Sequence, residues 1–401
     1  MADDQHGQLV LVQVTGRDHV GITAALSQTV ATAGAELIDI EQVVVQGHLT
    51  LCLLIRVDGT PAKGEPVLKD LLFTAKQMGL ELQFDLLEQQ EEGTGQDFFA
   101  VTAIGDALGA SQVAELTKAL ASHRANIVAI RRLSEGVLSS LEVIIALPEG
   151  SEEALRTTLI EQSDKHHFDV ALQRDNLTRR SKRLIVMDMD STLIQIEVID
   201  ELAKLAGVGD SVVAVTKEAM EGKLDFEASL RKRVSLLKGL DYAQVVQLSR
   251  NLPLTEGAPE LLRVLKTLGY KTAVISGGFM CAAEALQATL RLDYAYANRL
   301  EVRDGKLTGA LEGEIVTPQR KAELLSTIAQ HESIAAEQTI AIGDGANDLL
   351  MLSRAGLGIA FHAKKRLRDA ADTALSRGGL DRILYLLGLH ARDVQHLMKA
   401  P

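Results

Sequence analysis

The stretch Leu184-Ile185-Val186-Met187-Asp188-Met189-Asp190-Ser191-Thr192 joins a short apolar run to an acidic loop. Four consecutive apolar residues predict a strand that is buried on both faces, as in a parallel sheet. Ligands of open α/β sheets collect beyond the carboxyl ends of such strands. Residues two apart can face the same way, so Asp188 and Asp190 can both address one ligand there.

Two further apolar runs end in polar, glycine-containing loops. Thr272-Ala273-Val274-Ile275 leads into Ser276-Gly277-Gly278, where a hydroxyl and backbone N–H groups can hold an anion before a helix. Thr339-Ile340-Ala341-Ile342 leads into Gly343-Asp344-Gly345-Ala346-Asn347-Asp348, whose carboxylates suit a hard cation. Its glycine spacing does not fit a dinucleotide fingerprint. Apolar runs alternating with amphipathic helices predict an open, Rossmann-like parallel α/β sheet.

Each of these elements also has a plain structural interpretation. The Asp-x-Asp segment can be an acidic loop in which Ser191 or Thr192 caps the next helix. The Ser-Gly-Gly segment can be a tight turn, and Lys321 alone can be an ordinary surface lysine. A calcium loop is excluded, because its twelve-residue pattern requires Gly and Glu where this chain has Leu193 and Ile199.

Taken together and in this order, the elements resemble the haloacid dehalogenase superfamily of phosphatases. The matching residues are Asp188-x-Asp190-x-Thr192, Ser276, Lys321 and Gly343-Asp344-x-x-x-Asp348. Residues of about 200–252 are helical in pattern and are expected to form a cap over the sheet. Within and beside this insertion, three segments resemble the phosphoserine phosphatase family in particular: Glu197, Lys217 to Phe226, and Ser229 to Leu237. The resemblance extends over roughly 184–384.

The resemblance implies a phosphoryl-transfer mechanism. Asp188 would be the nucleophile that forms an aspartyl-phosphate, and Asp190 would be the general acid and base. Lys321 would offset the charge on the transferred group. Mg²⁺ would be the cofactor, bound by the side chains of Asp188 and Asp344 and by the backbone carbonyl of Asp190. Asp348 would order the water molecules around the metal or the side chain of Asn347.

The same resemblance implies the substrate, O-phospho-L-serine, and its hydrolysis to L-serine and phosphate as the last step of serine biosynthesis. Residues expected to contact it are Ser276, Gly277 and Asn347 at the phosphate, Arg233 at the carboxylate, Glu197 at the ammonium group, and Met220 and Phe226 as an apolar wall. Two alternatives stay open: Arg233 and Glu197 can form a cap salt bridge without a ligand, and Met220 and Phe226 can be cap core.

The first half of the chain contains a repeat of about 85 residues. Strand and helix patterns follow a βαββαβ order twice, separated by the polar linker Gln89–Gln96. The expected elements are strands at Leu9–Thr15, Ile38–Val45, Leu49–Val57 and Glu81–Leu87 with helices at Ile22–Ala33 and Val67–Met78, then strands at Phe98–Ile104, Ile127–Leu133, Ser139–Leu147 and Asp169–Gln173 with helices at Ser111–Ser122 and Glu152–Lys165. Both copies resemble ACT domains, which pair side by side and bind amino acids. The turn Gly16–Ile22 resembles the family's first strand-to-helix loop, whereas Gly105–Gly109 keeps only its outline.

These patterns predict three domains. Two ACT-like regulatory domains at 1–90 and 97–174 precede a phosphatase domain at 182–401, with the charged segment Arg174–Arg183 as a linker. The ACT resemblance implies an amino-acid effector, such as serine, with Asp18 and Gly21 as candidate contacts. It also implies a homo-oligomer with an even number of subunits, such as a dimer. The last stretch, Ile383 to Met398, predicts one helix.

Composition excludes several classes of partner. The 401 residues include 42 Lys and Arg against 54 Asp and Glu, a net charge of −12, which disfavours nucleic acid and anionic membranes. Only 3% are aromatic and Trp is absent, so stacking platforms for single strands are not expected. No apolar run approaches the roughly 20 residues of a membrane helix. No signal peptide is recognised, and Cys52 and Cys281 have no paired spacing, so a reducing, cytoplasmic location is expected.

Two other functions remain compatible with the sequence. The chain can be a related phosphatase or phosphotransferase that acts on another small phosphate monoester. It can also be an amino-acid sensor built on a catalytically silent phosphatase fold. The joint presence of Asp188, Asp190, Lys321 and Asp344 favours an enzyme over a sensor.

Overall fold

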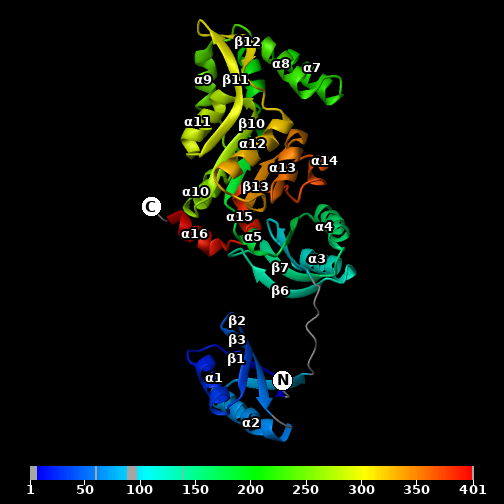
Figure 1. Ribbon diagram of the computed structural model, residues 1–401, viewed down its shortest axis with the longest axis vertical. Coiled ribbons are helices and arrows are strands. Elements are labelled where there is room, and N and C mark those ends of the chain that lie inside the picture. Colours follow the sequence, from blue (N-terminus) through cyan, green and yellow to red (C-terminus); the bar gives the residue numbers. More distant parts are fainter. Residues whose placement is uncertain (1–6, 59–60, 88–96, 138, 400–401) are drawn as a thin grey trace, which may run out of the picture. The chain divides into compact units, whose positions relative to one another are not determined.

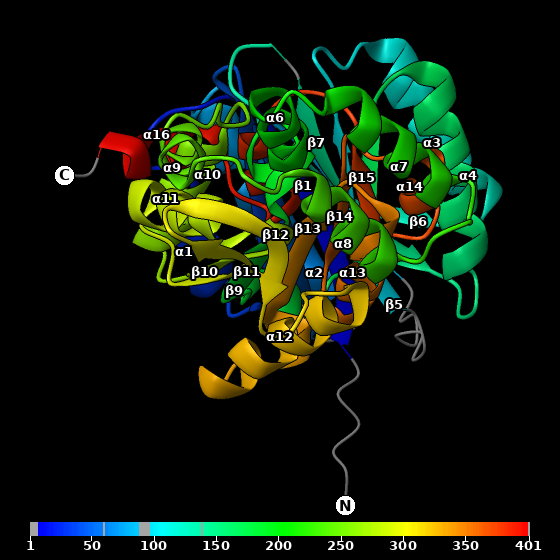
Figure 2. The ribbon, with the colours of Figure 1, turned by 90° about the horizontal axis from the view of Figure 1, so that it is seen from above.

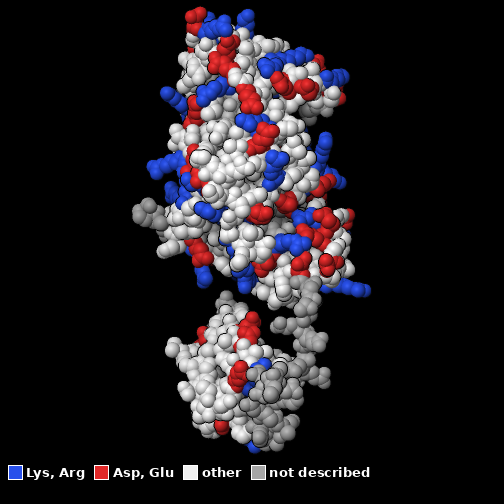
Figure 3. Space-filling model, viewed as in Figure 1, with Lys and Arg blue, Asp and Glu red and all other residues white. Residues whose placement is uncertain are grey.

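The computed structural model describes residues 7–58, 61–87, 97–137 and 139–399 of the chain, and these fall into two compact units, 1–94 and 95–401 (Figure 1). The linker expected at Gln89–Gln96 lies outside the described residues. No helix among the described residues is long and apolar enough to cross a membrane. On the face seen in Figure 3, basic and acidic side chains of the larger unit are interspersed rather than gathered by sign.

The smaller unit is a four-stranded antiparallel sheet with two helices on one face. Its elements are β1 (Gly7–Arg17), α1 (Ile22–Thr32), β2 (Glu36–Val45), β3 (His48–Asp58), α2 (Pro61–Gln77) and β4 (Glu81–Leu87), with strand order β2-β3-β1-β4. Alternate residues of the strands, such as Val10, Val12 and Val14, are buried beneath the helices. The βαββαβ order predicted from the sequence is confirmed.

The larger unit begins with the second copy of this arrangement. Its elements are β5 (Asp97–Ile104), α3 (Ala110–Ser122), β6 (Asn126–Arg132), β7 (Ser140–Leu147), α4 (Glu152–His166) and β8 (Asp169–Arg174), with strand order β6-β7-β5-β8. The predicted repeat is therefore confirmed as well. The segment after it, expected to be a charged linker, contains α5 (Leu177–Arg180) and packs tightly, because Arg179 is 4% exposed and pairs with Glu142 and Asp175.

The rest of this unit is the predicted parallel α/β sheet. Its parallel strands, in spatial order, are β11 (Tyr294–Arg303), β10 (Lys271–Phe279), β9 (Leu184–Met187), β13 (Thr339–Gly343), β14 (Gly358–Phe361) and β15 (Thr373–Leu375), and β12 (Lys306–Glu312) adds an antiparallel edge. One face, through Ile185 and Met187, packs on α10 (Ala258–Thr267) and α11 (Met280–Leu290). The other face packs on α12 (Pro318–His331) and α13 (Leu349–Arg354). Burial on both faces explains the unbroken apolar run of β9.

The predicted cap is a set of four helices between β9 and β10. They are α6 (Val198–Leu205), α7 (Gly209–Met220), α8 (Phe226–Leu236) and α9 (Tyr242–Ser249). Asp225 caps α8, since its Oδ1 accepts a hydrogen bond of 2.7 Å from the Ala228 N–H. Helix α8 lies beside β12, which holds the cap over the carboxyl edge of the sheet (Figure 2).

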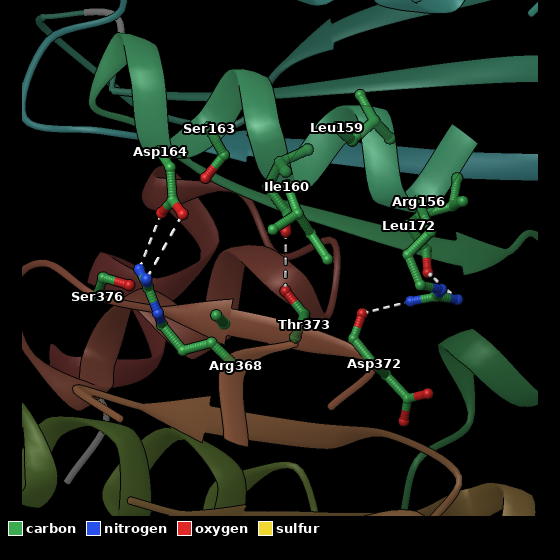
Figure 4. Close-up of a pocket in the computed structure, with 12 residues that line it drawn as sticks. Arg156, Leu159, Ile160, Ser163, Asp164, Leu172, Arg368, Asp372, Thr373 and Ser376 are labelled. Carbon is green, nitrogen blue, oxygen red and sulfur yellow. Dashed lines mark hydrogen bonds and ion pairs between the residues drawn. The ribbon is translucent and has the colours of Figure 1, made fainter. Parts of the chain in front are cut away.

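The second ACT-like part and the parallel sheet are one continuous sheet of eleven strands. Strand β8 pairs with β15 through Ala171 and Thr373, and the Thr373 hydroxyl donates to the Val170 carbonyl at 3.1 Å. Arg156 on α4 donates to the Asp372 carbonyl, and Arg368 of α14 (Lys365–Arg368) forms an ion pair of 2.9 Å with Asp164, as Figure 4 shows. The junction is therefore held by backbone and side-chain contacts together.

The C-terminal stretch differs from its prediction. Instead of one helix over Ile383–Met398, there are two, α15 (Ile383–Leu386) and α16 (Ala391–Lys399). Gly388 between them has φ of 75°, a left-handed conformation that ends a helix and that glycine adopts without strain. The prediction of a single helix was wrong because apolar periodicity continued across this break.

Candidate active site

Asp188 lies at the carboxyl end of β9, at the centre of the sheet edge. Its backbone N–H donates to the Ile342 carbonyl of β13 at 2.9 Å, so the residue is fixed by the sheet. Its Oδ1 accepts a hydrogen bond of 2.7 Å from the Met189 N–H. The chain then turns sharply at Ser191, whose φ is 57°. Asp188 is thus 4% exposed, with its carboxylate directed at a pocket below the cap.

Asp190 also lines this pocket, but it is held by the cap. Its Oδ1 accepts a hydrogen bond of 3.0 Å from the Val198 N–H, in the first turn of α6. Burial, with the nearby charges of Glu197 and Asp188, raises the pKa of Asp190 well above its ordinary value. This environment favours the protonated carboxyl group, the form that can give up a proton.

Lys321 is buried beneath the pocket. Its Nζ lies 2.8 Å from Oδ1 of Asp188 and 2.7 Å from Oδ1 of Asp348, and the residue is fully excluded from solvent. Burial alone lowers the pKa of Lys321, but the carboxylates of Asp188 and Asp348 outweigh this effect and hold it above its ordinary value. The interpretation of Lys321 as a surface lysine is therefore wrong.

Three carboxylates form a cluster that can hold a cation. Oxygen atoms of Asp188, Asp344 and Asp348 lie within 4.8 Å of one another. Burial, and next the charge of Asp188, raises the pKa of Asp344 to about 7 and that of Asp348 to about 7. Crowded, buried carboxylates of this kind are stabilised by a divalent ion with oxygen ligands, such as Mg²⁺. Asp190 contributes no side-chain oxygen to this cluster.

The loop after β13 is built around Asp348. One oxygen of Asp348 binds Lys321, and the other accepts a hydrogen bond of 3.2 Å from the Gly345 N–H. A Cβ on Gly343 would lie 2.4 Å from Cγ of Asp348, which explains the glycine there. Because both oxygens of Asp348 are engaged, this residue is placed to position the loop that carries Asp344.

The loop after β10 leaves the sheet register. Pairing with β11 shifts between Ile275 and Phe279, so the residues between them form no ladder and face the pocket. The Ser276 hydroxyl accepts a hydrogen bond of 2.8 Å from the Gly278 N–H. A Cβ on Gly278 would lie 2.4 Å from Oδ2 of Asp190, and one on Gly277 would lie 2.8 Å from Cζ of Phe226. With glycine at both positions, the backbone approaches these side chains without displacing them.

The pocket that these segments enclose has a volume of about 200 Å³. Its lining includes most residues expected from the sequence, namely Asp188, Asp190, Glu197, Phe226, Arg233, Ser276, Gly277, Asp344 and Asn347. Lys321 and Asp348 support it from below. Met220 ends α7, and its side chain lies outside the described part of the chain.

Three lining residues were not expected from the sequence, Ile199, Leu230 and Phe279, while Gly278 belongs to the predicted anion-binding loop. Leu230 lies three residues before Arg233 on α8 and so shares its face. Helical spacing was therefore a signal that could have found Leu230, whereas Ile199, two residues after Glu197, had no such signal.

Arg233 and Glu197 place opposite charges at the cap side of the pocket. Glu197 accepts a hydrogen bond of 2.8 Å from the Ser191 hydroxyl, and burial raises its pKa. Burial lowers the pKa of Arg233, whose Nε is buried without a hydrogen-bond partner. No ion pair within 4.0 Å joins these two residues in the described structure, which disfavours the interpretation as a cap salt bridge.

The candidate effector residues lie in the smaller unit. Asp18 and Gly21 belong to the turn between β1 and α1, where the Asp18 N–H donates to the Gly47 carbonyl at 2.9 Å. Gly21 has φ of 100°, so a residue with a side chain would be strained there.

Comparison with known proteins places this architecture. Residues 182–356 match the haloacid dehalogenase-like hydrolase family, and residues 8–85 and 98–173 each match an ACT domain. A haloacid dehalogenase-like hydrolase is thus the class of protein that the fold and the pocket define. A phosphoserine phosphatase of Streptomyces coelicolor is 42% identical over 96% of this chain and 93% of its own length. One of Mycobacterium tuberculosis is 38% identical over 96% and 94%.

The chain belongs to the phosphoserine phosphatase family. Among solved structures, a probable phosphoserine phosphatase of Vibrio cholerae in unliganded form has a TM-score of 0.59 and is 37% identical, over 77% of this chain and 91% of its own. A hydrolase of the haloacid dehalogenase family from Salmonella enterica has a TM-score of 0.64 and is 32% identical, over 72% and 98%.

Proposed function

We propose that this chain hydrolyses O-phospho-L-serine to L-serine and inorganic phosphate, the last step of serine biosynthesis. One observation carries the proposal. The same pocket contains Asp188, which is ion-paired with Lys321, and two further residues of opposite charge, Arg233 and Glu197. Hydrolysis of a phosphate ester needs a nucleophile and a loop that binds the phosphate anion. An amino acid needs one group for its carboxylate and one for its ammonium. The pocket offers both.

The chemistry follows from the places of two carboxyl groups. An oxygen of Asp188 attacks phosphorus, the bond to the seryl oxygen breaks, and Asp190 gives its proton to that oxygen. The product of this step is serine and a phosphoryl group on Asp188. A water molecule then attacks phosphorus, Asp190 accepts its proton, and phosphate leaves. The raised pKa of Asp190 supports its role in the first step.

The residues around Asp188 fit a Mg²⁺ ion. The side chains of Asp188 and Asp344, with the backbone carbonyl of Asp190, would hold it, and Asp348 would position Asp344. When bound, Mg²⁺ supplies neutralising charge and alignment for the phosphoryl group. Lys321 carries the remaining positive charge, and its complete burial keeps that charge unscreened.

Recognition of the substrate divides between the sheet and the cap. Ser276, Gly277 and Asn347 would hold the phosphate oxygens. Arg233 would bind the carboxylate through its fork of donors, one of which, Nε, is buried and unpaired. Glu197 would bind the ammonium group, while Phe226 and, in our proposal, Met220 close the apolar wall.

The direct test is release of inorganic phosphate from O-phospho-L-serine, O-phospho-L-threonine and p-nitrophenyl phosphate, with and without Mg²⁺. Release that requires the metal and favours phosphoserine is expected. Arg233→Ala should then weaken phosphoserine far more than p-nitrophenyl phosphate, which has no carboxylate beside the ester. Equal weakening would remove the carboxylate role. Activity on the generic ester alone would indicate another phosphomonoesterase or phosphotransferase, and no activity would favour an amino-acid sensor.

The second part of the proposal is regulation by an amino acid, such as serine, that binds the ACT domains. We propose two such domains, at 1–90 and 97–174, followed by the phosphatase domain at 182–401 with its cap at about 200–252. The assembly would have an even number of subunits, as in a dimer. Asp18 and Gly21 are the candidate contacts. Since residues 95–401 form one unit, removal of 1–94 is the cleaner test. The shortened protein should keep its activity and lose part of its sensitivity to serine. Unchanged sensitivity would locate serine elsewhere, including at the active site as product.

A further inference from the structure

Asn298 has a buried side-chain amide, and it was not among the residues expected from the sequence. It lies on β11, is 1% exposed, and pairs in register with Phe279, the first residue after the distorted part of β10. Two hydrogen bonds engage its side chain. Nδ2 donates to the Gly277 carbonyl at 2.7 Å, and Oδ1 accepts from the Val316 N–H at 2.8 Å.

We propose that Asn298 is a positioning residue for phosphate binding. It fixes the loop at Gly277 to the start of the helix that carries Lys321. The argument begins with the shift in register. Because Ser276, Gly277 and Gly278 leave the ladder, the Gly277 carbonyl has no strand partner. The amide of Asn298 takes the place of that partner and so fixes the loop, whose three residues line the pocket.

The second bond leads to Lys321. Val316 immediately precedes Thr317, whose hydroxyl caps α12 by accepting from the Arg320 N–H at 3.2 Å. The Thr317 carbonyl accepts from the Lys321 N–H at 2.9 Å. One side chain therefore joins the loop expected to hold phosphate to the first turn of the helix that positions the buried lysine.

A side-chain amide meets both demands. The Gly277 carbonyl needs a donor and the Val316 N–H needs an acceptor, and an asparagine side chain supplies one of each. An ionised aspartate of the same shape keeps the acceptor but has no proton for Gly277. An alanine has neither group.

The sheet offers a matched control at the opposite end of the same strand pair. Thr272 on β10 is fully buried, and its hydroxyl donates to Oδ2 of Asp293 at 2.8 Å. Like Asn298, it links β10 to the segment of β11 through a side-chain hydrogen bond, here to Asp293 just before that strand. Unlike Asn298, it lies at the amino end of β10, away from the pocket.

The experiment compares Asn298→Asp, Asn298→Ala and Thr272→Val in the full-length protein with Mg²⁺. It measures kcat, KM, the inhibition constants of inorganic phosphate and L-serine, and the thermal midpoint. Both Asn298 variants should lower kcat/KM by about 10- to 100-fold, as misplaced reacting groups do. The inhibition constant of phosphate should rise by about tenfold, while that of L-serine, held by the cap, stays within about twofold. Thr272→Val should lower only the thermal midpoint.

The inference rests on the proposed function, and the two can fail separately. If the wild-type protein does not hydrolyse phosphoserine, the proposed function fails, and calorimetric binding of inorganic phosphate to wild type and Asn298→Asp still decides the role of Asn298. If the Asn298 variants lose phosphate and serine binding equally, or behave like Thr272→Val, Asn298 only stabilises the fold and the inference is overturned. Asn298→Ala, which adds no charge, excludes simple repulsion of phosphate by an introduced carboxylate.

Discussion

Lys321 and Asp188 meet through one oxygen: Nζ of the lysine lies 2.8 Å from Oδ1 of the aspartate. The Met189 N–H donates to the same Oδ1, and Oδ2 accepts no hydrogen bond from the described residues. The carboxylate is therefore held by one oxygen and presents the other to the pocket. This geometry fits a nucleophile whose orientation is set before the substrate arrives, which reduces the entropy lost in reaching the transition state.

Replacement of Asp188 by Asn should abolish turnover, because an amide is a poor nucleophile and cannot form the aspartyl-phosphate. Phosphate release should fall to the level of a protein-free blank. Asp190→Asn should lower kcat by about 10²- to 10⁴-fold, as loss of a general acid does. Thermal melting of both variants with and without Mg²⁺ is the control for folding. Retention of substantial activity in Asp188→Asn would assign the nucleophile to another residue.

Replacement of Lys321 by Met should reduce both activity and stability. The change leaves Asp188 and Asp348 buried together without their cation, a loss of about 3–5 kcal/mol in the free energy of unfolding. Denaturant unfolding at neutral pH measures it. Mg²⁺ should restore part of the stability, since it neutralises the same carboxylates. Lys204→Met removes an exposed lysine paired with Glu201 and should change little. Equal effects of the two substitutions would show that the buried contacts do not stabilise the fold.

Mg²⁺ binding should tighten as pH rises through neutrality. Asp344 and Asp348 have pKa values of about 7, above the ordinary value of 3.8, so below pH 7 they carry protons that a cation must displace. Calorimetry in two buffers of different ionisation enthalpy should detect proton release at pH 6.5 and much less at pH 8.5. Equal proton release at the two pH values would contradict the prediction, because it would show that neither carboxyl group titrates in this range.

The same shift predicts how metal-free stability depends on pH. A carboxyl group whose pKa is raised by folding binds more protons in the folded than in the unfolded state between about pH 4 and pH 7. Its contribution is fully present below the unfolded value and is lost as pH rises through about 7. The stabilisation by Mg²⁺ in thermal melts should accordingly grow over this range. Asp348→Asn should flatten the dependence, and an unchanged slope in that variant would contradict the assignment.

Alanine at the two glycines of the phosphate loop should have unequal effects. At Gly277 the new Cβ would meet the end of the Phe226 ring, which can rotate away, so KM should rise moderately. At Gly278 it would meet Asp190 and Met189 at 2.4 and 2.7 Å, so kcat should be lost. Steady-state kinetics separate the two. Phe226→Leu combined with Gly277→Ala should recover part of the loss, and an additive double variant would exclude this contact.

The grouping of the candidate active-site residues could be predicted from the sequence because they lie at the ends of parallel strands. Asp188, Ser276 and Asp344 each come just after an apolar run, and parallel strands bring such positions together without further information. The burial of Lys321 had a signal in its own helix, where the apolar Leu324 and Leu325 share its face. What the helix does not show is that two carboxylates from distant segments replace water around the amine.

Asn298 and the junction at β15 had no local signal. Asn298 lies in a strand of mixed polar and apolar residues, and its importance arises only because β10 leaves register opposite it. Strand β15 is three residues long, too short for a pattern. By contrast, the break between α15 and α16 had a signal in Gly388, which apolar periodicity outweighed in the prediction.

The eleven-stranded sheet limits how the second ACT domain can communicate with the catalytic centre. Strands β8 and β15 share backbone pairing, and Ile104 and Ala171 belong to the same apolar core as the catalytic strands. A hinge motion at this boundary would expose that core and break the pairing, so large rotations are energetically disfavoured. Within the sheet, β14 and β15 lie between β8 and β13, the strand that leads into the loop of Asp344. The second ACT domain is therefore an extension of the same sheet and not a separately hinged domain.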